Sequence, residues 1–197
     1  GFNRRYAAEG PFVMAAVDWW GMSEPDAAAI VAVGDDLDRA FGFVDRLQQA
    51  MINQLALTRA LRTSIPLIEA LRRFDRPLYD PDQVSFYGIS QGHIFGVAAV
   101  ALNPWIERAV LGVGGGPYSL MMSRSSNFAQ LLTLVELLLD DPVMTQKLLC
   151  LSQHTWDRVD ALTWSTELLR EPLPGSPERQ ILAHMGVGDH SVPNLAS

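Results

Sequence analysis

The spacing of apolar residues changes along the chain between a pattern typical of strands and one typical of helices. Short apolar runs that suit buried parallel strands occupy residues 12–17, 84–89, 108–115 and 181–187. Between the first two runs, apolar residues recur at helical spacing over residues 37–55, and Asp35 and Asp36 are placed to cap that helix. Residues 66–73 are expected to form a further helix that begins at Pro66. This order predicts an α/β fold with a mostly parallel sheet and crossover helices.

From residue 117 onwards the pattern is helical, with no clear strand before residue 181. The expected helices cover residues 128–139, residues 141–151 and residues 161–170. A proline-rich linker follows at residues 171–177. We therefore expect residues 117–175 to form a helical insertion, and ordinary helices packed on the sheet are the alternative.

The junction between the strand at residues 84–89 and the helix after it carries a motif. Gly88, Ser90 and Gly92 form the pattern G-x-S-x-G. Such a turn holds the serine in a strained conformation, and glycine is expected on both sides because the chain passes close to itself. The bare pattern arises by chance in roughly one chain of this length in fifteen. The strand and the helix around it therefore carry the prediction, and an incidental serine in a glycine-rich turn is the alternative.

Together these features resemble the core of the α/β-hydrolase superfamily, which includes serine esterases and lipases. Three other segments match in the expected order: residues 12–23, residues 108–115 and residues 181–193. The first contains Asp18-x-x-Gly21-x-Ser23, and the last contains the pattern G-x-x-D-x-x-V-P around Asp189. The resemblance covers nearly the whole chain. It implies one α/β-hydrolase-like domain over residues 1–197, with residues 117–175 as a lid-like helical insertion.

The resemblance also implies a reaction, the hydrolysis of an ester through an acyl-enzyme on Ser90. The backbone N–H of Gln91 is then expected to donate to the oxyanion, because one donor follows the nucleophile in this fold. Asp189 follows a strand in a glycine-rich turn, which is where the fold places the catalytic acid. A turn-forming aspartate is the alternative at that position. No cofactor and no metal are expected, because the chain lacks metal-ligand and phosphate-loop spacings.

The general base is the part of this scheme that the sequence does not supply. The chain contains four histidines: His93, His154, His184 and His190. None follows Asp189 at a distance that would allow another strand and loop to return to Ser90. We therefore expect the catalytic histidine and the second oxyanion donor to lie outside these residues, which makes the chain a fragment lacking both ends of the domain.

Other candidate residues have plainer interpretations. Asp18 ends the first predicted strand, and its place suggests a carboxylate that structures a loop rather than a catalytic one. Trp19 and Trp20 either line the mouth of a pocket or pack beneath a loop. Cys150 is the only cysteine, so no internal disulfide can form, and we expect it to be buried in a helix.

Composition and charge narrow the class of partner. Hydrophobic residues make up 48% of the chain, and the formal net charge is -7 without any run of Lys or Arg. This balance argues against nucleic acid, and the apolar run at residues 131–139 is too short to span a bilayer. A small ester with an apolar acyl group is the expected substrate. The competing hypothesis is a catalytically inactive hydrolase-like domain that binds or scaffolds.

Overall fold

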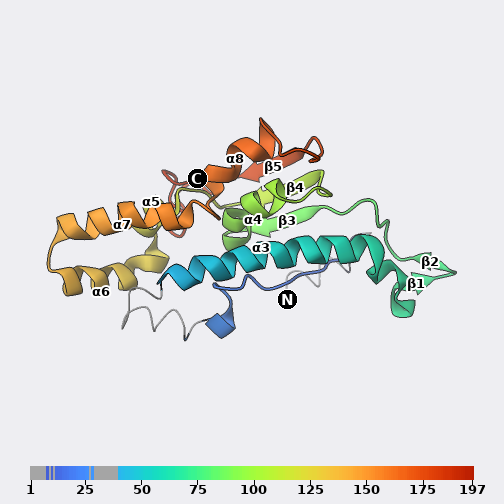
Figure 1. Cartoon of the computed structure of the whole chain (residues 1–197), viewed down its shortest axis with the longest axis horizontal. Coiled ribbons are helices and arrows are strands. Elements are labelled where there is room, and N and C mark those ends of the chain that lie inside the picture. Colours follow the sequence, from blue (N-terminus) through green and yellow to red (C-terminus); the bar gives the residue numbers. More distant parts are fainter. Residues whose placement is uncertain (1–7, 9, 11, 27, 29–39) are drawn as a thin grey trace.

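A three-stranded parallel sheet forms one part of the fold, and helices pack beside it (Figure 1). The computed structural model describes residues 8, 10, 12–26, 28 and 40–197. The strands are β3 (Phe86–Ile89), β4 (Arg108–Gly112) and β5 (Gln180–His184), in the spatial order β3-β4-β5. The chain is therefore a mixed α/β protein, and three of the four predicted strands are confirmed.

Helix α4 (Gln91–Ala101) follows β3 and is the most deeply buried element of the fold. Every residue from Ile94 to Ala101 is buried. It packs against β3, β4, α3 (Ala40–Thr63) and α8 (Ala161–Leu169). A Cβ added to Gly96 would come within 2.7 Å of the Phe86 ring, so this small residue lets the helix lie close to β3. The helix predicted after the G-x-S-x-G motif is thus confirmed.

The long helix α3 matches the helical spacing seen in the sequence. Its residues Val44, Leu47 and Met51 are buried and join the same core cluster as Phe95 of α4. The proposed caps Asp35 and Asp36 and the expected helical residues 37–39 lie outside the described residues.

The expected helix at residues 66–73 is wrong. The segment instead forms two short 3-10 turns, Ile65–Leu67 and Glu69–Leu71, and a small antiparallel hairpin of β1 (Arg72–Arg73) and β2 (Arg76–Pro77). Ile68 adopts an extended conformation that interrupts the helix, and its side chain is exposed, as is that of Leu67. Apolar spacing alone does not form a helix where no surface covers its apolar face.

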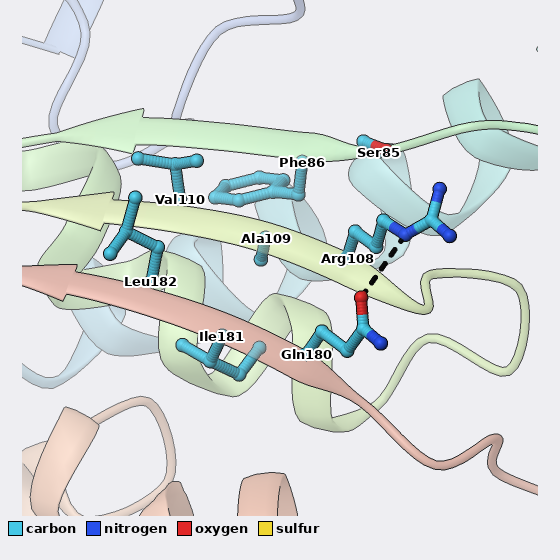
Figure 2. A pocket seen from close by; sticks show the side chains of 8 residues that line it. All are labelled: Ser85, Phe86, Arg108, Ala109, Val110, Gln180, Ile181 and Leu182. Carbon is cyan, nitrogen blue, oxygen red and sulfur yellow. Dashed lines mark hydrogen bonds between the residues drawn. The ribbon is translucent and has the colours of Figure 1, made fainter.

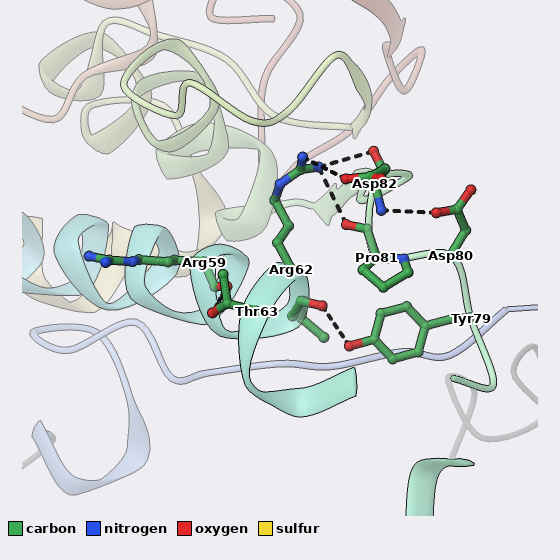
Figure 3. A network of polar contacts seen from close by, with 8 residues as sticks. Arg59, Arg62, Thr63, Tyr79, Asp80, Pro81 and Asp82 are labelled. Carbon is green, nitrogen blue, oxygen red and sulfur yellow. Dashed lines mark hydrogen bonds and ion pairs between the residues drawn. The ribbon is translucent and has the colours of Figure 1, made fainter. Parts of the chain in front are cut away.

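Polar contacts tie the segment after this hairpin back to the end of α3 (Figure 3). Arg62 forms an ion pair of 3.0 Å with Asp82 and donates hydrogen bonds to the backbone carbonyls of Pro81 and Asp82. The Tyr79 hydroxyl donates a 2.6 Å hydrogen bond to the Leu61 carbonyl. These contacts guide the chain from the hairpin into β3.

The expected buried strand at residues 12–17 is also wrong. The segment is extended but pairs with none of the described strands. Phe12, Val13 and Met14 are between 38% and 48% exposed. The Gln54 side chain of α3 donates a 3.4 Å hydrogen bond to the Val17 carbonyl. An apolar run indicates a tendency to be buried, but the partner strand that would bury it is not encoded locally.

The region after β4 is helical, as predicted. It contains α5 (Tyr118–Met122), α6 (Ala129–Leu139), α7 (Pro142–Trp156) and α8. Helices α6 and α7 form a hairpin that projects from one end of the molecule, whereas α8 packs on α4 beside the sheet (Figure 1). Asp141 caps α7 and Asp160 caps α8. Among the described residues, no helix has both the length and the apolar character needed to cross a membrane.

Candidate functional site

Ser90 occupies the turn between β3 and α4 in a strained backbone conformation. Its φ is 54° and its ψ is -117°. Its N–H donates a 2.8 Å hydrogen bond to the Gly112 carbonyl of β4, and its carbonyl accepts from the N–H groups of His93 and Ile94. The serine thus belongs to the sheet on one side and to the helix on the other. The expected strand, tight turn and helix with a positive φ at the serine are confirmed.

The two glycines of the motif have different roles. A Cβ on Gly88 would lie 2.1 Å from the Gly92 carbonyl oxygen, which leaves no room for any side chain. A Cβ on Gly92 would meet nothing within 4 Å. The expectation that both positions require glycine is therefore correct for Gly88 and wrong for Gly92. The two positions differ because the backbone carbonyl of Gly92 lies close to Gly88, whereas a side chain on Gly92 would point into open space.

Gln91 is the first residue of α4, next to Ser90. The backbone N–H of a first helical residue has no acceptor within its own helix, so it can serve another group. The side chain of Gln91 donates a 3.3 Å hydrogen bond to the carbonyl of Met22, in the loop at residues 21–26. The predicted oxyanion donor therefore stands at the turn, and its side chain is anchored to that loop.

Asp189 lies in the loop after β5. Because β3, β4 and β5 are parallel, this loop is at the same sheet edge as Ser90, with the end of β4 between them. Its Oδ1 accepts hydrogen bonds from the N–H groups of Ser191 and Val192, at 2.7 and 3.1 Å. Asp189 thus shapes its own turn with one oxygen. Among the described residues, no hydrogen bond joins it to Ser90.

None of the four histidines forms a hydrogen bond with the Ser90 side chain within the described part of the chain. Nδ1 of His93 accepts a 2.8 Å hydrogen bond from the Gly114 N–H, and burial lowers the pKa of this imidazole. His154 is exposed on α7. The backbone carbonyls of His184 and His190 accept hydrogen bonds from Val113 and Ser126.

The loop at residues 21–26 is organised by Asp26, a residue that the sequence analysis did not single out. Asp26 is 2% exposed. Its Oδ2 accepts hydrogen bonds from the Gly21 N–H, the Ser23 N–H and the Ser23 hydroxyl, and its Oδ1 pairs with Arg46 of α3. Burial alone would raise the pKa of this carboxyl, but the hydrogen bonds from Ser23, Gly21 and Arg46 lower it to about 2.

The role of loop-structuring carboxylate that we expected of Asp18 therefore falls to Asp26, and Asp18 is exposed. A sequence signal for this was present. Ser23-x-x-Asp26 has the spacing of a capping box, in which the fourth residue bonds back to the N–H of the first. Residues Glu24–Asp26 form a single 3-10 turn.

We can also compare the burial of three other side chains with what we expected of them. Trp19 packs against Phe95 with ring centroids 5.8 Å apart, as the packing alternative predicts. Trp20 is 47% exposed, with the Arg46 guanidinium 5.9 Å from its ring centroid. Cys150 is exposed on α7, so its expected burial is wrong. None of the three contacts the serine turn by a hydrogen bond.

A shallow hollow of about 420 Å³ lies at the opposite ends of the strands (Figure 2). It is lined by the first residues of β3, β4 and β5, and Arg108 donates a 3.3 Å hydrogen bond to Gln180 across it. Because these strands run away from the hollow towards Ser90, it lies apart from the serine turn. In the described part of the chain, no three His, Cys, Asp or Glu side chains gather as metal ligands would.

Comparison with protein-family models, with curated proteins and with solved structures finds no match for this chain. The chemistry of the site therefore has to be argued from its geometry.

Proposed function

We propose that this chain carries the nucleophile and the acid of a serine hydrolase that cleaves carboxylic esters through an acyl-enzyme on Ser90. The observation that carries the proposal is the positive φ of Ser90 at a strand-to-helix turn. A non-glycine residue in such a conformation costs of order 1–3 kcal/mol, and strain of this kind concentrates at functional sites. Glycine would relieve it, so a serine at this position indicates a use for its hydroxyl.

The sheet supports the pairing of Ser90 with Asp189. The serine follows β3, the aspartate follows β5, and the chain order is the one that α/β-hydrolases use. Neighbouring strands lie about 4.8 Å apart, so β3 and β5 are separated by about 10 Å across β4. An imidazole fits between a serine and a carboxylate at that separation. Because Oδ1 of Asp189 holds its own turn, Oδ2 is the atom that we assign to the base.

The reaction then follows from these groups. The base removes the proton of Ser90 while Oγ attacks the ester carbonyl carbon, and the oxyanion accepts a hydrogen bond from the Gln91 N–H. Collapse of the tetrahedral intermediate breaks the bond to the alcohol, which leaves with the proton from the base. Water repeats the sequence on the acyl-enzyme and releases the acid. The positive end of α4 favours the negative charge at both stages.

We assign the base to a histidine outside these residues. Burial lowers the pKa of His93, and Nδ1 of this imidazole is already a hydrogen-bond acceptor. Exchanging His154, His184 and His190 for glutamine, one at a time, tests the assignment. Ester hydrolysis should persist in the His154, His184 and His190 variants. A complete loss in one of these three would place the base within the chain.

We further propose that the hairpin of α6 and α7 is a lid and that the acyl group is apolar. No residue of α6 is buried, although eight of its eleven residues are apolar. Leu137 and Leu138 are 75% and 65% exposed. Exposed apolar surface of this kind marks a site for a ligand or partner. A small apolar ester is the substrate that matches it, without a cofactor or nucleic acid.

The second candidate is a hydrolase-like domain that binds but does not catalyse. The observation that favours it is the engagement of His93, the histidine nearest to Ser90 in sequence, by the backbone of Gly114. A serine without a base keeps the weak nucleophilicity of an ordinary alcohol. In that case the strained turn would serve only as a rigid scaffold.

Hydrolysis of p-nitrophenyl butyrate separates the two candidates. The protein expressed from its complete coding sequence should hydrolyse the ester, and Ser90→Ala should lower kcat by about 10³-fold or more. Asp189→Asn should lower it by a comparable factor without changing the fold. Ser85→Ala is the matched control, because Ser85 is an exposed serine at the other end of the same strand. Equal activity in the Ser90→Ala variant would exclude the proposal.

A further inference from the structure

We propose that Asp26 is a positioning residue for the serine turn, acting through Met22 and the side chain of Gln91. The inference rests on the proposed function, because the atom that it positions is the proposed oxyanion donor. Asp26 itself touches neither Ser90 nor Gln91 by a hydrogen bond among the described residues. Its effect passes through the loop at residues 21–26.

In the first step, one carboxylate oxygen of Asp26 holds the backbone of the loop in place. Oδ2 of Asp26 accepts from the Gly21 N–H at 2.8 Å and from the Ser23 N–H at 3.1 Å. These two groups belong to the residues on either side of Met22. The Ser23 hydroxyl adds a third hydrogen bond to the same oxygen. The backbone on both sides of Met22 is therefore fixed, and the direction of the Met22 carbonyl with it.

The second step is the contact between the loop and the turn. The Met22 carbonyl accepts the hydrogen bond from Nε2 of Gln91. The side chain of Met22 is held as well, because its sulfur accepts a 3.8 Å hydrogen bond from the Tyr118 hydroxyl. Tyr118 is buried in the core between the rings of Phe95 and Trp156. Met22 thus connects a rigid part of the core to the residue beside Ser90.

The third step is the ion pair with Arg46. It ties the loop to α3, which also packs on α4. The pKa of about 2 keeps Asp26 ionised throughout the pH range in which esterases work. A charged acceptor holds its donors more firmly than a neutral one. The loop, α3 and the first residue of α4 are therefore joined through one permanently charged group.

The expected consequence concerns the transition state more than the bound substrate. A hydrogen-bond donor contributes to catalysis when it is already aimed at the position that the oxyanion will occupy. Anchoring the Gln91 side chain limits the freedom of its backbone N–H at the half-buried start of α4. Loss of the anchor should lower kcat and leave KM nearly unchanged.

The test is a double-mutant cycle in the protein expressed from its complete coding sequence, with p-nitrophenyl butyrate as substrate. Asp26→Ala removes the hydrogen bonds that Asp26 accepts from the loop. Gln91→Met removes the side-chain donor but keeps the backbone N–H and a side chain of similar size. Each change should lower kcat about three- to tenfold, the range expected for one hydrogen bond, with KM within about twofold. The double variant should match the slower single variant, because both changes break the same connection.

Two further variants complete the cycle. Asp26→Asn keeps an acceptor for the loop but loses the charge and the ion pair, so its kcat should lie between that of Asp26→Ala and that of wild type. If Asp26→Ala does not fold, Gln91→Met alone still tests the connection. Glu24→Gln is the matched control, since Glu24 is an exposed carboxylate in the same 3-10 turn. Effects that multiply in the double variant, or a Gln91→Met variant with wild-type kcat, would overturn the proposal.

Amide hydrogen exchange separates failure of this inference from failure of the proposed function. Asp26→Ala and Gln91→Met should both speed exchange in the segment at residues 88–95, and Glu24→Gln should not. This readout needs no activity. A protein without any esterase activity that still shows the coupled exchange would refute the hydrolase and retain the connection. Unchanged exchange in both variants would refute the connection itself.

Discussion

The backbone N–H of Gly114 donates a 2.8 Å hydrogen bond to Nδ1 of His93, and this contact joins the first turn of α4 to the loop after β4. A Cβ on Gly114 would lie 2.4 Å from the imidazole, so the glycine is what allows the ring to approach. The bond requires a neutral imidazole, because a protonated one has no acceptor nitrogen. Burial lowers the pKa of His93 in agreement with that requirement.

Stability should therefore depend on pH through His93. Its pKa is lower in the folded state than the ordinary value of 6.5, so the unfolded chain takes up the proton first. The contribution of His93 should be present above pH 6.5 and should decline as the pH falls below it. Urea unfolding between pH 5 and pH 8 should show this decline in the wild type and in His154→Gln, and a weaker one in His93→Phe. An identical pH dependence in all three would contradict the assignment.

The two glycines of the serine turn should respond differently to alanine. Gly88→Ala forces a methyl group against the Gly92 carbonyl and should lower the free energy of unfolding by about 3 kcal/mol. Gly92→Ala places its methyl group in open space within a helix and should raise it by about 0.4–1 kcal/mol. Denaturant unfolding of both variants measures the difference. Equal destabilisation of the two variants would mean that Gly88 does not lie as close to the Gly92 carbonyl as the structure shows.

Asp160 should matter more than the similar cap Asp141. Asp160 is 1% exposed and accepts hydrogen bonds from the N–H groups of Tyr118 and Leu162, so it caps α8 and holds the start of α5. Asp160→Ala should cost about 2–3 kcal/mol of unfolding free energy, because it leaves buried donors unpaired. Asp141→Ala removes an exposed cap and should cost about 1 kcal/mol. The same loss in both variants would argue against a bridging role.

The backbone strain at Ser90 should be measurable as a lower free energy of unfolding. Ser90→Gly removes the side chain that disfavours a φ of 54°, whereas Ser90→Ala keeps a Cβ in the same conformation. Ser90→Gly should therefore unfold with a free energy about 1–2 kcal/mol higher than Ser90→Ala, and neither should hydrolyse ester. A pair of variants with equal stability would show that the turn relaxes at no cost.

The parts of the fold that were predictable are those that local sequence determines. The strand, serine and helix around Ser90 follow from a backbone requirement written within a few residues. The start of α7 at Asp141 and Pro142 follows from the same kind of local rule. The motif also located Gly88, because a close approach of two nearby residues needs a glycine whatever the rest of the chain does.

The parts that failed depend on partners far away in the sequence. The apolar run at residues 12–17 reads as a strand, but a strand needs a partner elsewhere in the sequence, and it pairs with none of the described strands. The run at residues 66–73 has helical spacing without a surface to pack on. The spacing Ser23-x-x-Asp26 marks a local turn, but the burial of Asp26 and its ion pair with Arg46, twenty positions later, cannot be read from a local pattern.

The central claim is that Ser90 is a nucleophile, and covalent labelling with a fluorophosphonate tests it most directly. Oγ of an activated serine bonds to phosphorus and displaces fluoride, which leaves a permanent mass on one peptide. In the protein expressed from its complete coding sequence, we predict the label on Ser90, its loss in Ser90→Ala and its retention in Ser85→Ala. A label on another serine, or none on Ser90, would contradict the account.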